Sequence, residues 1–233
     1  ATMRPIEESM ERQSRFVSDA SHELRTPLTA LQTANEVALR NTKLKIGEAR
    51  EVLEYTIAEV TKLRELTAAL LGLARSDAPL EREDFNIQEA ISEAIQPIIP
   101  VAQEKRISID DGATRQIVHA NMQASAQIIR ILLENAVKYS PDKTTVRLMV
   151  EPMKTHTDLL VIDQGVGIES SDHDKIFERF YRVDESRSSV NGSGFGLGLA
   201  IARELAAKQG IKVSVKESSP ESGTTFCIRF PKK

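Results

Sequence analysis

From Phe16 to Leu28 the sequence reads FVSDASHELRTPL, and its apolar residues recur at the spacing of one face of an α-helix. That face is formed by Phe16, Val17, Ala20, Leu24, Leu28 and Leu31. At about 100° per residue, the side chain of His22 points roughly 180° away from the centre of the face. The stretch therefore predicts an amphipathic helix whose histidine is exposed to solvent.

Two long helices are predicted around this stretch. Residues 5–76 are rich in Glu, Arg, Leu and Ala, which favour helix, and Asn41 to Gly47 is the strongest turn signal. We expect a helical hairpin whose end is closed by Leu44 and Ile46. The second helix carries an apolar stripe formed by Leu53, Ile57, Val60, Leu63, Leu66, Leu70 and Leu73. Because two helices leave much of such a stripe uncovered, we expect two chains to form a homodimeric four-helix bundle.

The second half of the chain has a different pattern, in which helices and strands alternate. Helices are expected over residues 87–101 and 121–139, and strands over 106–110, 145–151, 159–163, 211–216 and 224–230. The short polar loop between the second and third of these strands predicts an antiparallel hairpin. The fold class is therefore α+β: a helical hairpin at residues 1–77, a linker at 78–84, and an α/β sandwich with a mixed sheet at 85–233.

Composition narrows the classes of function. Hydrophobic residues make up 40% and charged residues 28% of the 233 residues, as in ordinary soluble globular proteins. A net charge of -3 gives no basic surface for nucleic acid, so we expect no nucleic-acid partner. The single cysteine, Cys227, cannot form an internal disulfide and indicates a reducing compartment. No apolar run approaches the roughly 18 residues of a membrane span, so we expect a soluble chain.

A helix in the second half combines two groups suited to a phosphorylated ligand. Residues 132–140 read LLENAVKYS, which places Asn135 and Lys138 three residues apart on one helical face. An amide oxygen suits Mg²⁺ and an ammonium group suits a phosphate. Taken alone, this pair is more typical of an ordinary amphipathic helix.

Two glycine-rich segments follow. In DQGVG, residues 163–167, the carboxylate of Asp163 stands at the end of an expected strand, where it can accept a hydrogen bond from an exocyclic amine such as that of adenine. In GSGFGLG, residues 192–198, backbone amides precede an apolar helix and can bind phosphate. Neither segment has the P-loop pattern, and the motifs of Ser/Thr kinases are absent as well.

The octapeptide from Ser21 to Leu28 resembles the phosphoacceptor motif of histidine kinases. The resemblance implies that His22 accepts the γ-phosphoryl group of ATP and that Glu23 acts as the base. It also implies that Glu23 and Thr26 support dephosphorylation of the partner, the receiver domain of a response regulator. Pro27 should bend the helix beside the histidine.

The motifs of the second half resemble, in order and spacing, the ATP-binding domain of histidine kinases, a member of the GHKL superfamily shared with gyrase, the Hsp90 chaperones and MutL. The resemblance implies ATP and Mg²⁺ as cofactors, an aromatic motif at residues 176–182 and a lid at 183–191. It assigns Asn135 to the metal and implies a nucleotide site formed by Asn135, Lys138, Tyr139, Asp163, Gly165, Gly167, Arg182, Arg187, Gly194, Gly196, Leu197 and Gly198. The chain would be the cytoplasmic part of a membrane-anchored sensor, anchored through an upstream segment.

One position departs from the family pattern. Ile131 stands where the family commonly has a second asparagine, and where the ATP-hydrolysing relatives have a glutamate base. The lack of this glutamate argues against an enzyme that works by hydrolysing ATP. Two alternatives stay open: an ATPase that couples hydrolysis to conformational change, and an interaction module that binds nucleotide without transferring phosphate. Arg203 and Glu204, on the helix after the glycine loop, are expected to be solvated.

Overall fold

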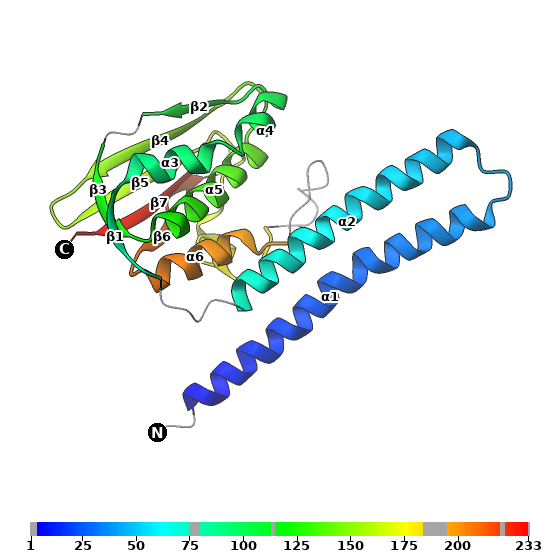
Figure 1. Ribbon diagram of the computed structural model, residues 1–233. Coiled ribbons are helices and arrows are strands. Elements are labelled where there is room, and N and C mark those ends of the chain that lie inside the picture. The colour runs from blue at the N-terminus through cyan, green and yellow to red at the C-terminus, as the bar shows by residue number, and fades with distance from the viewer. Residues whose placement is uncertain (1–3, 75–79, 113–114, 184–194, 220–221, 233) are drawn as a thin grey trace. The chain divides into compact units, whose positions relative to one another are not determined.

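The computed structural model describes residues 4–74, 80–112, 115–183, 195–219 and 222–232 (Figure 1). For residues 4–17, 19, 65, 69 and 71–74 it describes the backbone alone. The chain forms two compact units, a helical one that ends at Ser76 and an α/β one that begins at Asp77. Among the described residues, neither long helix has a stretch apolar enough to cross a bilayer.

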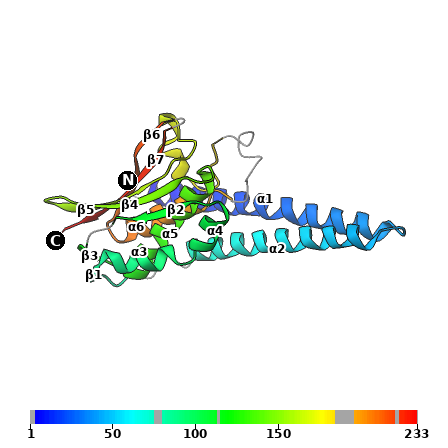
Figure 2. The ribbon, with the colours of Figure 1, turned by 90° about the horizontal axis from the view of Figure 1, so that it is seen from above.

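The helical unit is an antiparallel hairpin of α1 (Arg4–Arg40) and α2 (Ile46–Ala74), which lie side by side in both views (Figures 1 and 2). The predicted turn is confirmed: α1 ends at Arg40, and the amide of Leu44 donates to the carbonyl of Asn41 at 3.1 Å. The prediction that Ile46 closes the end of the hairpin is wrong, since its side chain is 91% exposed.

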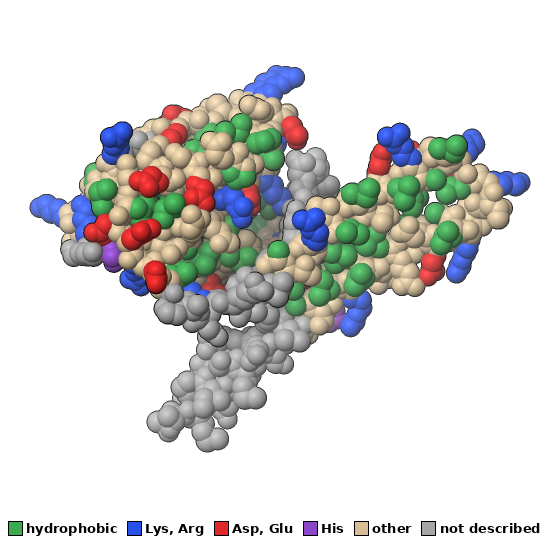
Figure 3. Space-filling model, viewed as in Figure 1, with side chains coloured by type: hydrophobic (Ala, Val, Ile, Leu, Met, Phe, Trp, Pro, Cys, Tyr) green, Lys and Arg blue, Asp and Glu red, His purple; other side chains and the backbone are tan. Residues whose placement is uncertain are grey.

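Much of the apolar surface of the hairpin is uncovered in the single chain. Leu66 is fully buried, whereas a set of large apolar side chains is exposed: Leu28, Val37, Leu53, Ile57 and Val60. Figure 3 shows hydrophobic side chains gathered along this unit. Such a surface is typical of helices that pack against a second chain, and it is consistent with the expected four-helix bundle.

The α/β unit is built on a mixed five-stranded sheet in the order β2-β4-β5-β7-β6. Its strands are β2 (Ser108–Asp111), β4 (Thr145–Pro152), β5 (His156–Ile162), β6 (Lys212–Ser219) and β7 (Gly223–Pro231). Strands β2 and β4 are parallel and the other neighbours are antiparallel, which confirms the mixed sheet and the β4–β5 hairpin. The helices α3 (Ile87–Ile95), α5 (Met122–Tyr139) and α6 (Gly198–Lys208) cover one face (Figures 1 and 2).

The core lies between this face of the sheet and the helices. Alternate residues of each strand point toward the helices because side chains in a strand alternate between its two faces. They meet four fully buried residues of α5: Ile128, Ile129, Leu132 and Leu133. This packing holds α5 against the sheet, so the polar residues of its last two turns have fixed positions.

Two expectations about the elements need correction. The helix predicted over residues 87–101 is broken: α3 ends at Ile95, and α4 (Ile99–Glu104) begins after Pro97, with Pro100 in its first turn. A second, two-stranded sheet of β1 (Glu83–Asn86) and β3 (Ile117–Ala120) was not predicted, because such short polar strands give little periodic signal. Strand β1 includes two residues of the expected linker.

Candidate functional site

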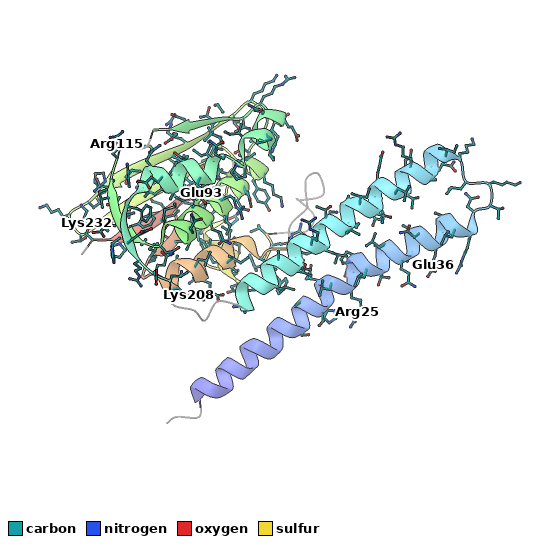
Figure 4. All side chains as sticks on the ribbon, in the orientation of Figure 1. Arg25, Glu36, Glu93, Arg115, Lys208 and Lys232 are labelled. Carbon is teal, nitrogen blue, oxygen red and sulfur yellow. The ribbon has the colours of Figure 1, made fainter. Side chains whose placement is uncertain are left out.

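The first candidate site is the exposed face of α1 around His22. The imidazole side chain is exposed, as predicted, while Ala20 on the opposite face is buried. The hydroxyl of Thr26 donates to the carbonyl of His22 at 3.3 Å, so it lies one turn beyond the histidine on the same side. Arg25, three residues after His22, points away from α2 (Figure 4). The histidine is therefore accessible to a reactant in the single chain.

The apolar face of α1 departs in part from its prediction. Leu24 and Leu31 are half-buried, but Leu28 is 53% exposed, and the side chains of Phe16 and Val17 lie outside the described residues. Pro27 is buried, and α1 continues through it as one helix.

The second candidate site begins with Asp163, just after β5. Its carboxylate is 6% exposed. One carboxylate oxygen, Oδ1, accepts hydrogen bonds from the amide of Gly165 at 2.8 Å and from the amide of Thr224 at 3.0 Å. Burial raises the pKa of the carboxyl, against the effect of these two bonds. With Oδ1 committed to the backbone, Oδ2 is left for a hydrogen-bond donor from a ligand.

Gly165 brings this carboxylate to the end of α5. An ideal Cβ on Gly165 would lie 2.9 Å from Oδ1 of Asp163 and 2.9 Å from the carbonyl oxygen of Tyr139. Real Cβ atoms do not approach other atoms so closely, so only glycine permits this contact. Gly167 has a φ of +71°, a conformation that glycine adopts without strain.

Three predicted nucleotide residues lie on the last two turns of α5. The Nδ2 group of Asn135 donates to the carbonyl of Ile131 at 2.9 Å, which leaves its Oδ1 as a free oxygen ligand. Lys138 is half-buried, and its ammonium lies 5.2 Å from the centre of the Tyr139 ring. Tyr139 itself is 46% exposed. Each of these side chains can therefore reach a ligand at this end of the helix.

Two later segments contact each other and α5. The amide of Phe180, which has a φ of +64°, donates to the carbonyl of Gly196 at 3.0 Å. An ideal Cβ on Gly196 would lie 2.7 Å from the carbonyl oxygen of Tyr181, and one on Gly198 would lie 3.4 Å from Ile131. The aromatic motif, the glycine loop and α5 thus meet at one place, as the resemblance implies.

The glycine loop leads directly into α6. Gly198 is the first residue of the helix, so it carries little of the usual helix penalty of glycine. Leu197, which precedes it, is buried at 3% exposure. The amides at this helix start remain available to a phosphate group.

Arg203 is exposed, as expected, whereas Glu204 is half-buried. Glu204 forms an ion pair of 2.9 Å with Arg179, and the guanidinium of Arg203 lies 5.6 Å from the centre of the Phe177 ring. Both contacts tie α6 to the aromatic motif. Arg182 is exposed, while Arg187, Gly194 and most of the expected lid lie outside the described residues.

Sequence reasoning missed two residues that support Asp163. Thr224 donates its amide to Oδ1, as described above, and its carbonyl accepts from the amide of Asp163 at 2.9 Å. Gly223 has a φ of +81°, and an ideal Cβ there would lie 2.1 Å from the carbonyl oxygen of Asp163. The Gly-Thr-Thr sequence at the start of β7 was the available signal.

The residues of the second site fit Mg²⁺. Magnesium takes oxygen ligands and is commonly held by one or two side chains together with the phosphates of a substrate. The free amide oxygen of Asn135 is such a ligand. Within the described part of the chain, no group of three or more His, Cys, Asp or Glu side chains forms an alternative metal site.

Comparison with known proteins gives matches for both units. Residues 12–79 match the family model of the His Kinase A (phospho-acceptor) domain, and residues 121–233 match that of the histidine kinase-, DNA gyrase B- and HSP90-like ATPases. Sensor protein CiaH of Streptococcus pneumoniae is 34% identical over 236 residues, which cover 98% of this chain and 52% of CiaH. The chain spans about half the length of the curated relatives it matches.

Solved structures give the same result. Histidine kinase ThkA, in complex with response regulator protein TrrA, matches with a TM-score of 0.79 at 20% identity, over 99% of this chain and 65% of ThkA, and shows the fold. Full-length ShkA in complex with AMPPNP matches with a TM-score of 0.66 at 27% identity, over 93% of this chain and 45% of ShkA. The chain belongs to the sensor histidine kinases of two-component systems, of which it carries the phosphoacceptor domain and the ATPase-type domain.

Proposed function

We propose that the chain transfers the γ-phosphoryl group of ATP to His22 and passes it on to an aspartate of a response regulator. The observation that carries the proposal is that one chain contains both an exposed histidine in a phosphoacceptor domain and a domain of the ATPase type. Of the relatives, ThkA is in complex with a response regulator, which supports the proposed acceptor protein. ShkA is in complex with AMPPNP, which supports the proposed nucleotide.

The residues have distinct roles in this proposal. Oδ2 of Asp163 accepts a hydrogen bond from the exocyclic amine of adenine, while Lys138 and Tyr139 contact the phosphates. The amides around Gly196 and Gly198, with Leu197 between them, hold the phosphates from the start of α6. Gly165 and Gly167 let the base approach the backbone. Arg182, Arg187 and Gly194 complete the proposed nucleotide contacts.

The metal has one role in this scheme. Held by the amide oxygen of Asn135 and by the phosphates, Mg²⁺ would neutralise the charge that repels a nucleophile. The protein residues themselves mainly position the reactants, which is the largest protein contribution to phosphoryl transfer.

The transfer to His22 exchanges one bond for another. A ring nitrogen of His22 forms a bond to the γ-phosphorus while the bond from that phosphorus to the bridging oxygen breaks, and ADP leaves with the electron pair. Glu23 takes the proton from the other ring nitrogen and so keeps the nucleophilic nitrogen available. In a second activity, Glu23 and Thr26 would orient a water molecule that removes the phosphoryl group from the response regulator.

We further infer that the chain acts as a homodimer and as the cytoplasmic part of a membrane-anchored sensor. Exposed apolar side chains along the hairpin, such as Leu53 and Ile57, support the dimer. The match to about half the length of CiaH, a sensor protein, supports further segments in the whole protein. Light scattering of the purified chain should give twice the mass of 25.8 kDa.

The phosphoryl transfer is tested with γ-labelled ATP and Mg²⁺. We expect a protein-bound label that is stable in alkali and labile in acid, as a phosphohistidine is. The label should be lost in His22→Ala and retained in the control His119→Ala, which changes a histidine paired with Asp84 in the other unit. Label that persists in His22→Ala would contradict the assignment. Steady phosphate release without a phosphoprotein would favour the ATPase. Nucleotide binding without phosphate release and without a phosphoprotein would favour the interaction module.

A further inference from the structure

One lysine of the α/β unit has all of its donors directed at the end of α5. The ammonium of Lys105 donates to the carbonyls of Val137, Lys138 and Ser140 at 2.8, 2.9 and 2.8 Å. A lysine ammonium has three donors, so these bonds use its full capacity. This residue comes from the end of α4, more than thirty residues before its partners in sequence.

Two of these carbonyls, those of Val137 and Lys138, belong to the last turn of α5, and the third belongs to Ser140, the residue that ends the helix. The last four carbonyls of an α-helix have no intrahelical donor, and together they carry the negative end of the helix dipole. A cation that contacts several of them at once therefore both completes their hydrogen bonds and fixes the last turn. Figure 1 shows the end of α4 beside the end of α5.

The backbone of Lys105 is itself held in place. Its amide lies at the end of α4, where it donates to the carbonyls of Gln103 and Val101, and its carbonyl accepts from the amide of Lys143 at 3.1 Å. The side chain therefore reaches α5 from an anchored position on a neighbouring element.

The turn fixed in this way carries the proposed phosphate contacts. Lys138 and Tyr139 lie on it, and the carbonyl of Tyr139 lies against Gly165, next to Asp163. We propose that Lys105 is a positioning residue: it holds the last turn of α5 through the carbonyls of Val137 and Lys138, so that the side chain of Lys138 meets the nucleotide. This inference rests on the proposed nucleotide site and adds a residue outside its motifs.

The geometry also distinguishes lysine from arginine. Three carbonyls converge on one nitrogen atom, which suits the compact ammonium group. A planar guanidinium spreads its donors over three nitrogens and cannot place them on the same three oxygens. Lys105→Arg, which keeps the charge, should therefore restore only part of the function.

The test compares Lys105→Met, which keeps the length and removes the donors, with the shorter Lys105→Gln, which keeps two. We expect the affinity for a non-hydrolysable ATP analogue with Mg²⁺ to fall roughly tenfold or more in Lys105→Met and less in Lys105→Gln. The matched control is Arg229→Met, which removes another cation of this unit, one bound to Asp158 by two hydrogen bonds of 2.8 and 2.7 Å. Arg229→Met should lower the melting temperature and leave nucleotide affinity unchanged.

A double-mutant cycle with Lys138→Ala separates positioning from general loss of stability. If Lys105 acts through the side chain of Lys138, then Lys105→Met should weaken binding much less in the Lys138→Ala background than in the wild type. Equal effects in both backgrounds, or a lower melting temperature at unchanged affinity, would overturn the inference. Because binding is measured without transfer, a chain that binds nucleotide but does not label His22 would refute the proposed function and leave this inference standing.

Discussion

The substitution Asp163→Asn tests the proposed adenine contact with little change of shape. The amide oxygen of asparagine can still accept from the amides of Gly165 and Thr224, which hold Oδ1 of the carboxylate at 2.8 and 3.0 Å. The NH₂ group then takes the place of Oδ2. Two donors, this NH₂ and the amine of adenine, would face each other, so the variant should bind ATP poorly.

The expected loss follows from the bond that is removed. A hydrogen bond to a charged acceptor contributes about 1.5 to 3 kcal/mol, which corresponds to roughly 10- to 150-fold weaker binding of ATP. Guanine has a carbonyl where adenine has its amine, and the new NH₂ can donate to a carbonyl. We therefore expect the preference for ATP over GTP to fall as well, measured by calorimetry with both nucleotides.

The same substitution should not weaken the fold. Burial raises the pKa of Asp163 above its ordinary value of 3.8, so the folded state holds the proton more tightly than the unfolded state. Ionisation of Asp163 therefore lowers the free energy of unfolding. This loss is absent below pH 3.8 and is complete above the pKa of Asp163 in the folded state. At pH 7, Asp163→Asn should melt at or above the temperature of the wild type without ligand, and this advantage should shrink as the pH falls.

A control on the same strand makes the result specific. Asp158 on β5 is also buried, but it binds Arg229 and lies outside the proposed site. Asp158→Asn should reduce stability and leave ATP affinity unchanged. The adenine contact is refuted if Asp163→Asn binds ATP as the wild type does, or if both variants lose affinity to the same extent.

Four further changes have defined outcomes. Gly165→Ala should lower both the melting temperature and ATP affinity, because its Cβ would lie 2.9 Å from two oxygens; unchanged values would contradict this. Hydrogen bonds from Arg229 lower the pKa of Asp158, so the stability gap between wild type and Asp158→Asn at pH 7 should close as the pH falls below 3.8 in acid titrations. Burial raises the pKa of Cys227 to about 11, so iodoacetamide at pH 8 should label it only after denaturation, as mass spectrometry would show. Ile131→Asn should cost about 2 kcal/mol or more in urea unfolding, because it buries an amide in the core, and should leave the Mg²⁺ dependence of nucleotide binding unchanged.

The sequence was informative where the chemistry is local. The period of the apolar residues predicts both long helices and the turn near Asn41, and the spacing of Asn135 and Lys138 places both on one turn of a helix that the structure confirms. The short strands β1 and β3 gave no such signal, since four residues are too few to show a period and their pairing depends on residues more than thirty positions apart. Helix α3 ends early because Pro97 follows it and proline interrupts a helix. The apolar residues continue past Pro97 at helical spacing, so their pattern alone predicted one longer helix.

The supporting residues of the nucleotide site could not be predicted for the same reason. The side chain of Lys105 donates to a backbone carbonyl 33 residues away, and the backbone amide of Thr224 donates to the carboxylate of Asp163, 61 residues away. Backbone groups are the same at every residue, so no pattern of side chains indicates which carbonyl a lysine will reach. Motifs identify the groups that meet a ligand, whereas the groups that hold them become visible only when the chain is folded.

Ile131 illustrates how a departure from a motif can leave the geometry of a site intact. Its side chain is 6% exposed and lies beside Gly198, where an ideal Cβ would be 3.4 Å away, an ordinary van der Waals contact. The amide of Asn135 is oriented by the carbonyl of Ile131, a backbone group that any residue at this position supplies. The free oxygen of Asn135 therefore keeps its direction without a second asparagine, and the apolar side chain at 131 adds to the core that holds α5 in place.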